Sequence, residues 1–315
     1  MGRKTIDRTG EININDQGLK MKIVKYRNAN NIDVEFISDG YVKKRVKYEH
    51  FKKGNIKNDN LENRLDEINY NKFGSKIIIK EYRNSLDVDI YFPEYDWIAK
   101  NVQYSNFKNG KIKCPYERSI CNVGYLGEGE YKATENGEIT RVYNTWKNML
   151  QRCYSEKLHR KESTYENCRA GEEWLNFQNF GEWDSDNFYQ IEGEKMCLDK
   201  DILVKGNKIY SPDTCMYVPQ TINSLFVKCD KIRGNTPIGV NKQKNKFRAQ
   251  CSVYDFENKN KKRINLGSYN SSQQAFETYK QFKERNIKEV ADYYKSKIPT
   301  KLYDALYNYE VEITD

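Results

Sequence analysis

The most informative segment of the chain is Cys197-Leu198-Asp199-Lys200-Asp201, then Gly206-Asn207, then Lys208-Ile209-Tyr210-Ser211-Pro212-Asp213-Thr214-Cys215. Its first five residues predict a strand that carries two acidic side chains. Gly206 and Asn207 are typical of tight turns, and Ile209-Tyr210 predicts a second short strand. We therefore expect a hairpin with two carboxylates on one strand.

The residues before this hairpin predict a helix and an aromatic core. Residues 140–154 have helical spacing, because their apolar side chains recur on one face: Tyr143, Trp146, Leu150, Cys153 and Tyr154. The aromatic side chains that follow are expected to complete the core, with base stacking as the alternative: Trp174, Phe177, Phe180 and Trp183.

Residues 140–226 resemble the HNH endonuclease-like proteins of phages and mobile elements. The matching elements are Trp146 … Met149-Leu150 … Arg152-Cys153-Tyr154, then Cys168 … Trp174-Leu175-Asn176-Phe177, then Leu198-Asp199-Lys200-Asp201 … Asn207 … Tyr210-Ser211-Pro212 … Cys215. The resemblance implies a ββα-metal module, in which a hairpin and a helix hold one Mg²⁺ or Mn²⁺ that stabilises phosphate charge during hydrolysis.

By this resemblance, Asp199, Lys200 and Asp201 are the catalytic candidates, and Asp199 and Asp201 are the metal ligands. Asp184 or Asp186 could complete the oxygen site. Lys200 stands where a histidine base is usual, and a phosphate-neutralising role suits it better. In the same module Thr214 replaces an expected asparagine, and His159 lies in a polar loop. An active endonuclease and a scaffold without catalysis both stay open, as does a hairpin whose aspartates only cap the turn and pair with lysines.

The C-terminal block predicts three strands and a long helix. The strands are expected near residues 237–240, 246–253 and 261–269, with polar turns at 241–245 and 257–260. Ser271 and Gln274 have capping-box spacing at the helix start. The apolar stripe of that helix is Ala275, Phe276, Tyr279, Phe282, Ile287 and Val290, and Leu302, Ala305 and Leu306 predict a further short helix after Pro299.

Residues 237–283 resemble the ethylene-response-factor (AP2-like) DNA-binding domain in their Gly-Val, Phe-Arg-Ala and Leu-Gly-x-Tyr elements. The resemblance implies a sheet that reads the major groove of double-stranded DNA, although Phe247 replaces the usual tryptophan. The DNA-binding candidates are Asn241, Lys242, Lys244, Lys246, Arg248, Gln250, Lys262 and Arg263. Arg favours guanine, Gln favours adenine, and the lysines suit phosphates. A basic sheet that binds protein is the alternative.

The N-terminal part contains a tandem duplication with a constant offset of 56 residues. Each copy alternates apolar and polar residues, which predicts strands and a small β-barrel of the Src-homology-three kind. The repeated Arg27/Arg83 and Lys52/Lys108 could contact phosphates or be structural. His50 corresponds to Asn106 and is expected at the surface.

Composition and charge place limits on the whole chain. The 315 residues carry a net charge of +9 and include 25 tyrosines, which favours several small modules with an anionic partner. Residues 231–270 hold ten Lys or Arg against Asp255 and Glu257, whereas residues 171–201 hold nine acids against two lysines. This layout suits a phosphate-binding surface beside a metal site, but two solvated faces of opposite sign would also produce it. AT-biased coding would also produce the overall net charge.

Eight cysteines without a Cys-x-x-Cys pair, and a polar start without an export signal, predict free thiols and a cytoplasmic, nucleoid-associated location. No apolar run is long enough to span a membrane. The spacing of Cys153, Cys168, Cys197 and Cys215 does not match a common zinc pattern, so a structural zinc is not expected.

The sequence therefore predicts an α+β multidomain protein. Its expected parts are a flexible tail (1–17), two barrel repeats (18–72 and 73–125), an HNH-like module (126–230) and an ethylene-response-factor-like module (231–315). Binding of double-stranded DNA is the expected function. The alternatives are an active metal-dependent DNA endonuclease and a non-catalytic phage effector that binds a host protein.

Overall fold

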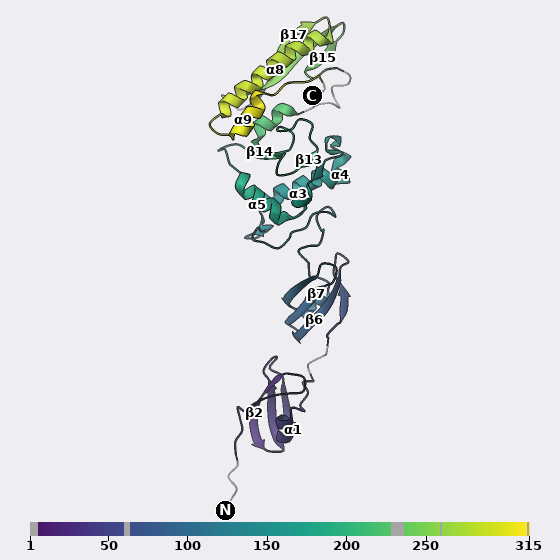
Figure 1. The fold of residues 1–315 in the computed structure, drawn as a ribbon, viewed down its shortest axis with the longest axis vertical. Helices are drawn as coiled ribbons and strands as arrows, with labels where there is room; N and C mark the ends of the chain where they lie inside the picture. Colours follow the sequence, from purple (N-terminus) through teal and green to yellow (C-terminus); the bar gives the residue numbers. More distant parts are fainter. Residues whose placement is uncertain (1–5, 60–63, 228–235, 259, 314) are drawn as a thin grey trace, which may run out of the picture. The chain divides into compact units, whose positions relative to one another are not determined.

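The computed structural model describes residues 6–59, 64–227, 236–258, 260–313 and 315. It is an α+β structure of small sheets and helices, and all sheets but one two-stranded pair are antiparallel (Figure 1). The chain divides into two compact units, Met1–Glu117 and Arg118–Asp315. None of the helices in the described ranges has the length and apolar content that a bilayer crossing needs.

The first unit contains two copies of one topology. The first copy consists of β1 (Ile12–Ile14), β2 (Lys20–Asn28), β3 (Asn31–Phe36), β4 (Val42–Val46) and α1 (Tyr48–Lys53). The second consists of β5 (Ile68–Tyr70), β6 (Lys76–Asn84), β7 (Asp87–Phe92), β8 (Trp97–Val102) and α2 (Tyr104–Lys108). In each copy the four strands are antiparallel neighbours in chain order.

The sheets of both copies are open, so the closed barrels expected from the sequence are not formed. Among the described strands, β4 does not pair with β1 and β8 does not pair with β5. A short helix covers each core instead, because Phe51 of α1 and Phe107 of α2 are almost fully buried. The first strand of each copy has only three residues, which leaves little backbone for closure.

The first copy begins earlier than the sequence suggested. Residues Ile12–Ile14 pair with β2, and the Asn13 side chain donates to the Phe51 carbonyl oxygen at 2.7 Å. Asn69 makes the equivalent bond to the Phe107 carbonyl at 2.8 Å. The flexible tail expected over residues 1–17 therefore does not extend to β1.

The repeated arginines are held within their own sheets. Arg27 lies near the end of β2 and donates to both carboxylate oxygens of Asp33 at 2.9 and 2.8 Å. This contact lowers the pKa of Asp33 to about 2. Arg83 donates in the same way to Asp87 and Asp89. Both arginines therefore link neighbouring strands of their own sheet.

The second unit begins with the aromatic core. Its elements are β9 (Thr134–Glu135), β10 (Glu138–Ile139), α3 (Arg141–Tyr154), α4 (Glu156–His159), η1 (Ser163–Tyr165), β11 (Arg169–Ala170), η2 (Glu172–Leu175), α5 (Phe177–Asn187), β12 (Met196–Asp199), β13 (Ile209–Tyr210) and β14 (Met216–Pro219). Thr140 caps α3 by accepting from the Tyr143 N–H, which agrees with the predicted helix start. Trp146 and Trp174 are fully buried, and the Trp146 indole donates to the Trp174 carbonyl at 2.7 Å.

The hairpin predicted between residues 197–201 and 209–210 is wrong. β12 pairs antiparallel with β14, and β13 pairs in parallel with β11. The first strand ends at Asp199, because its side chain turns back to accept from the backbone of the next residues. Asp201 therefore lies in the loop after the strand.

A second core joins the end of this module to the C-terminal block. Its elements are α6 (Gln220–Asn223), η3 (Ser224–Phe226), β15 (Val240–Gln243), β16 (Lys246–Asp255), β17 (Asn260–Tyr269), α8 (Ser272–Tyr294) and α9 (Thr300–Tyr307). α8 lies along the three-stranded sheet (Figure 1). One cluster of buried residues contains Ile202, Val218 and Ile222 together with Val240 and Ile287, so this core includes residues from both sides of position 230.

The long helix has the predicted cap and stripe. The Ser271 hydroxyl accepts from the Gln274 N–H, and α9 starts directly after Pro299. Gly239 precedes β15 with φ +73°, and a Cβ there would lie 2.1 Å from the Tyr279 ring. Only glycine therefore allows the sheet to pack this closely on α8.

Candidate nucleic-acid interface

The sheet β15–β17 has one face against α8 and one face turned away from it. Ala249 and Cys251 are buried against the helix, so the alternate residues of β16 point outward. Residues directly opposite each other in a sheet share a face, and the pairing therefore defines the rest. We call the following set the outer face: Asn241, Gln243, Lys246, Arg248, Gln250, Ser252, Tyr254, Lys261, Arg263, Asn265 and Ser268.

The outer face carries four basic side chains and no acidic one: Lys246, Arg248, Lys261 and Arg263. Amide and hydroxyl side chains fill most of the remaining positions, which gives the face both charge and hydrogen-bonding groups. Arg248 is half-buried, and its Nε has no hydrogen-bond partner among the described residues.

The structure separates the residues that the sequence grouped together. Five of them lie on the outer face: Asn241, Lys246, Arg248, Gln250 and Arg263. Lys242 is opposite Phe247 and Lys262 is opposite Val253, so both belong to the other face. Lys262 also forms an ion pair with Asp255, and Lys244 lies in the tight turn between β15 and β16 with φ +49°.

Sequence reasoning missed two residues with suitable chemistry, Lys261 and Tyr254, which are opposite each other on the outer face. The sequence did not reveal them because the pairing register of the strands decides which residues face outward. A β-bulge shifts the pairing between Ala249 and Gln250, so Arg263 and Ser268 both face outward although four residues lie between them, a spacing that gives opposite faces in a regular strand.

The expected metal site is a loop that satisfies its own polar groups. Asp199 Oδ1 accepts from the backbone N–H groups of Asp201 and Ile202 at 2.9 and 2.8 Å. Lys200 is buried, and its Nζ donates to Asp201 at 3.0 Å and to the Asn207 carbonyl at 3.0 Å. The Asn207 amide in turn donates to the carbonyls of Lys200 and Ile209, both at 2.7 Å.

This geometry changes the role expected for Lys200. Its ammonium group holds the loop together and does not point to solvent, so it is not placed to neutralise a bound phosphate. Burial, and then the nearby Asp201, raise the pKa of Asp199 to about 6. Asp201 is about half exposed and is paired with Lys200.

The other proposed ligands of a metal ion are dispersed. Asp184 is buried and bound by Arg141 and the Tyr217 hydroxyl, and Asp186 is exposed on α5. His159 Nε2 lies 2.7 Å from the Arg152 carbonyl, and His50 is exposed on α1. Within the described ranges, no three His, Cys, Asp or Glu side chains are grouped as metal ligands would be.

The four cysteines considered for zinc are free thiols. Cys153, Cys168 and Cys215 are buried in the aromatic core, and the Cys197 thiol donates to the Gln220 side chain. Burial raises the pKa of Cys153 and of Cys215 to about 12. Cys229 lies outside the described residues.

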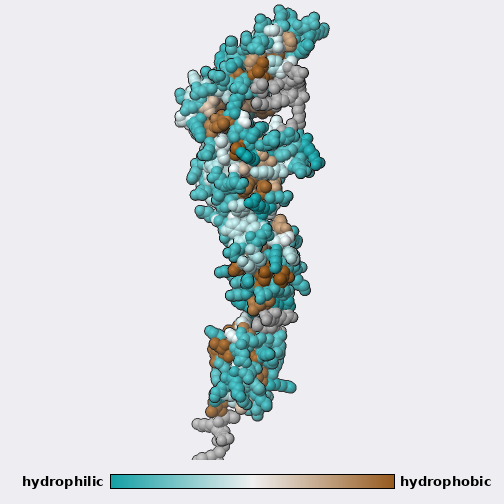
Figure 2. Space-filling model, turned by 45° about the vertical axis from the view of Figure 1, so that its right-hand side comes forward, coloured by the Kyte–Doolittle hydropathy of each residue, from teal (hydrophilic) through white to brown (hydrophobic). Residues whose placement is uncertain are grey.

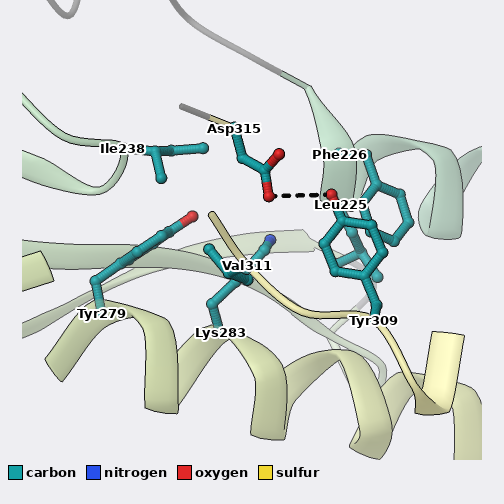
Figure 3. A pocket seen from close by; sticks show the side chains of 8 residues that line it. All are labelled: Leu225, Phe226, Ile238, Tyr279, Lys283, Tyr309, Val311 and Asp315. Atoms are coloured by element: carbon teal, nitrogen blue, oxygen red, sulfur yellow. Dashed lines mark hydrogen bonds between the residues drawn. The ribbon is translucent and has the colours of Figure 1, made fainter. Parts of the chain in front are cut away.

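A small pocket lies between α8 and the C-terminal segment (Figure 3). Its volume of about 20 Å³ is enough for roughly one water molecule. Lys283 points into it from α8, and its Nζ has no hydrogen-bond or ion-pair partner among the described residues. Burial lowers the pKa of Lys283. Asp315, on the opposite wall, pairs with Lys205 at 2.9 Å.

Comparisons with known protein families, curated proteins and solved structures found no match for this chain.

Proposed function

We propose that this protein binds double-stranded DNA through the outer face of the β15–β17 sheet. The observation that carries the proposal is the concentration of four basic side chains, without an acid, on the one face that α8 leaves open. Duplex DNA is a polyanion, so such a face gains affinity by releasing condensed counterions. The major groove is wide enough for a two-stranded β-ribbon, so two of the three strands at a time can enter it.

The face divides into two kinds of contact. Arg248 and Gln250 occupy successive outward positions of the central strand, where they can approach base edges. Arginine pairs with guanine and glutamine with adenine by two hydrogen bonds each. Lys246 lies at the start of β16, and Lys261 and Arg263 lie on β17; all three suit phosphates. The likeness to the ethylene-response-factor domain supports this arrangement.

The test is an anisotropy titration of a fluorescent mixed-sequence duplex with the full-length protein. We expect binding that the double variant Arg248→Ala/Gln250→Ala weakens at least tenfold, with its circular dichroism unchanged. A matched control is Gln273→Ala on α8, an exposed glutamine away from the sheet. Affinity that is absent at low salt, or equal for both variants, would refute the proposal.

Metal-dependent cleavage of DNA is a second candidate function. The succession of β12, β14 and α6 favours it. A strand that ends at Asp199, an antiparallel partner strand and an immediately following helix form the strand–strand–helix order of the HNH-like resemblance. The same DNA is incubated with Mg²⁺ or Mn²⁺ and with EDTA. Cleavage that EDTA and Asp199→Asn both abolish would support an endonuclease, and intact DNA with preserved binding would support a DNA-binding scaffold.

A further inference from the structure

Lys283 occupies the small pocket between α8 and the C-terminal segment. It lies one turn from Tyr279 and one turn from Ile287, both of which are buried, and only 7% of Lys283 itself is exposed. The surface in Figure 2 is mostly hydrophilic, so a lysine buried in this way differs from one that is hydrated at the surface. The side chain of Lys283 points into the pocket (Figure 3), whose other lining residues are mostly apolar: Leu225, Phe226, Ile238 and Val311.

The acid that lines this pocket does not serve as a counterion for Lys283. Asp315 on the opposite wall forms an ion pair with Lys205 at 2.9 Å and accepts from the Tyr309 hydroxyl at 3.2 Å. Burial raises the pKa of Tyr309, so its hydroxyl carries no charge at neutral pH. Among the described residues, the Nζ atom of Lys283 has no hydrogen-bond or ion-pair partner. An ammonium group there would be buried without a counterion, which is costly.

The neighbouring sheet adds no negative charge at this position. Cys251 of β16 and Lys261 of β17 are the groups of the sheet that act on Lys283. A charged Cys251 would raise the pKa of Lys283, but burial raises the pKa of Cys251 itself, so it is a neutral thiol at neutral pH. Burial first, and then the charge of Lys261, lower the pKa of Lys283. An unprotonated amine is a nucleophile because its lone pair is available.

We propose that Lys283 is a modification site at which dissolved CO₂ forms a carbamate. The lone pair on Nζ attacks the carbon atom of CO₂ and forms an N–C bond, while one C–O π pair moves onto oxygen. Nζ then passes a proton to water, so the amine and CO₂ give one carbamate anion and one proton. The charge of Lys261, which disfavours an ammonium group at Lys283, favours this anion.

The size and lining of the pocket favour CO₂ over other small reactants. The pocket has a volume of about 20 Å³, and the carbon of the adduct is bonded to Nζ, so little more than its two oxygens needs room. CO₂ is uncharged and has no dipole moment, so apolar walls accept it without the loss of hydrogen bonds. Aldehydes that carry a side chain exceed this volume, and a phosphate or sulfate ion would meet an uncharged amine. A single water molecule fits the same space and is the alternative occupant.

The test is a ¹³C NMR spectrum of the full-length protein, equilibrated at neutral pH with ¹³C-labelled CO₂ and bicarbonate. At about pH 7 a lysine with the ordinary pKa of about 10.4 is neutral in roughly one molecule in 2,500, so exposed lysines give little carbamate. We expect a carbamate at Lys283 with at least ten times the occupancy of any exposed lysine. Lys283→Met should remove this signal, whereas Lys288→Met, which changes an exposed lysine of the same helix, should retain it. The N-terminal amine is common to all three proteins and gives the background signal.

A second measurement locates the modification without a variant. Alkylation by an oxonium salt converts a carbamate into a stable ester, and mass spectrometry of the digested wild type then identifies the lysine that carries it. The expected position is Lys283. An ester on exposed lysines alone, or a carbamate signal of equal size in the wild type and Lys283→Met, would overturn the proposal. A wild-type spectrum with no carbamate beyond that of the N-terminal amine would also overturn it, in favour of a pocket that holds only water.

Discussion

The number of phosphate contacts on the outer face sets the salt dependence of DNA binding. Each neutralised phosphate contributes about −0.9 to the slope of log affinity against log salt, so Lys246, Lys261 and Arg263 predict about −2.7. Raising the salt from about 50 to about 200 mM is a fourfold change, so affinity should fall about 40-fold. Phosphate contacts from all seven basic residues described on β15–β17 and in the turn between β15 and β16 would give about −6.3.

Two adjacent residues provide the decisive comparison, since Arg263 faces outward and Lys262 faces the other way. Arg263→Ala should reduce the slope to about −1.8, because one phosphate contact is lost. Lys262→Ala removes an equal charge from the chain but should leave the slope unchanged, because its ammonium group is paired with Asp255.

The assay is anisotropy of a labelled duplex with the full-length wild type and both variants, over a series of NaCl concentrations. Circular dichroism of each variant controls for folding. An equal loss of slope in both variants would refute the assignment of faces, because charge alone would then govern binding. A wild-type slope near zero would refute the phosphate contacts themselves.

Three further changes test the packing. Arg141→Met should lower the free energy of unfolding by about 3 kcal/mol, measured by urea unfolding, because it leaves the buried Asp184 carboxylate without its cation. Lys283→Met should raise the free energy of unfolding at neutral pH. Burial lowers the pKa of this lysine, so the unfolded chain binds its proton more tightly than the folded protein does. The stability gained by the substitution should shrink as the pH rises towards about 10. Gly239→Ala should lower the melting temperature far more than Gly193→Ala. Both glycines have positive φ, but only at Gly239 would the added Cβ meet another side chain, the Tyr279 ring.

The helices α3, α8 and α9 were predicted from the sequence because their signals are local. The α3 stripe and the capping of α8 by Ser271 both depend on residues within a few positions of each other. The aromatic core around Trp146 and Trp174 followed from the same periodicity.

Strand pairing was predicted poorly because it depends on residues far apart in the chain. Ile209-Tyr210 has the composition of a strand, but nothing in it reveals that its partner is Arg169–Ala170 and not Met196–Asp199. The same limitation applies to the candidate site. Residue type selected Lys242 and Lys262 as DNA contacts, whereas the register turns both away from the outer face.

Because β17 contains a bulge, the number of residues in this strand decides which side chains face outward. Loss of Leu266 would remove the extra residue and leave Arg263 opposite Ser252, as it is now. Loss of Ile264, two positions away, would place Arg263 opposite the buried Cys251 and bring Lys262 outward. A single deletion could therefore be silent or could rebuild the charged surface, depending on which side of the bulge it falls.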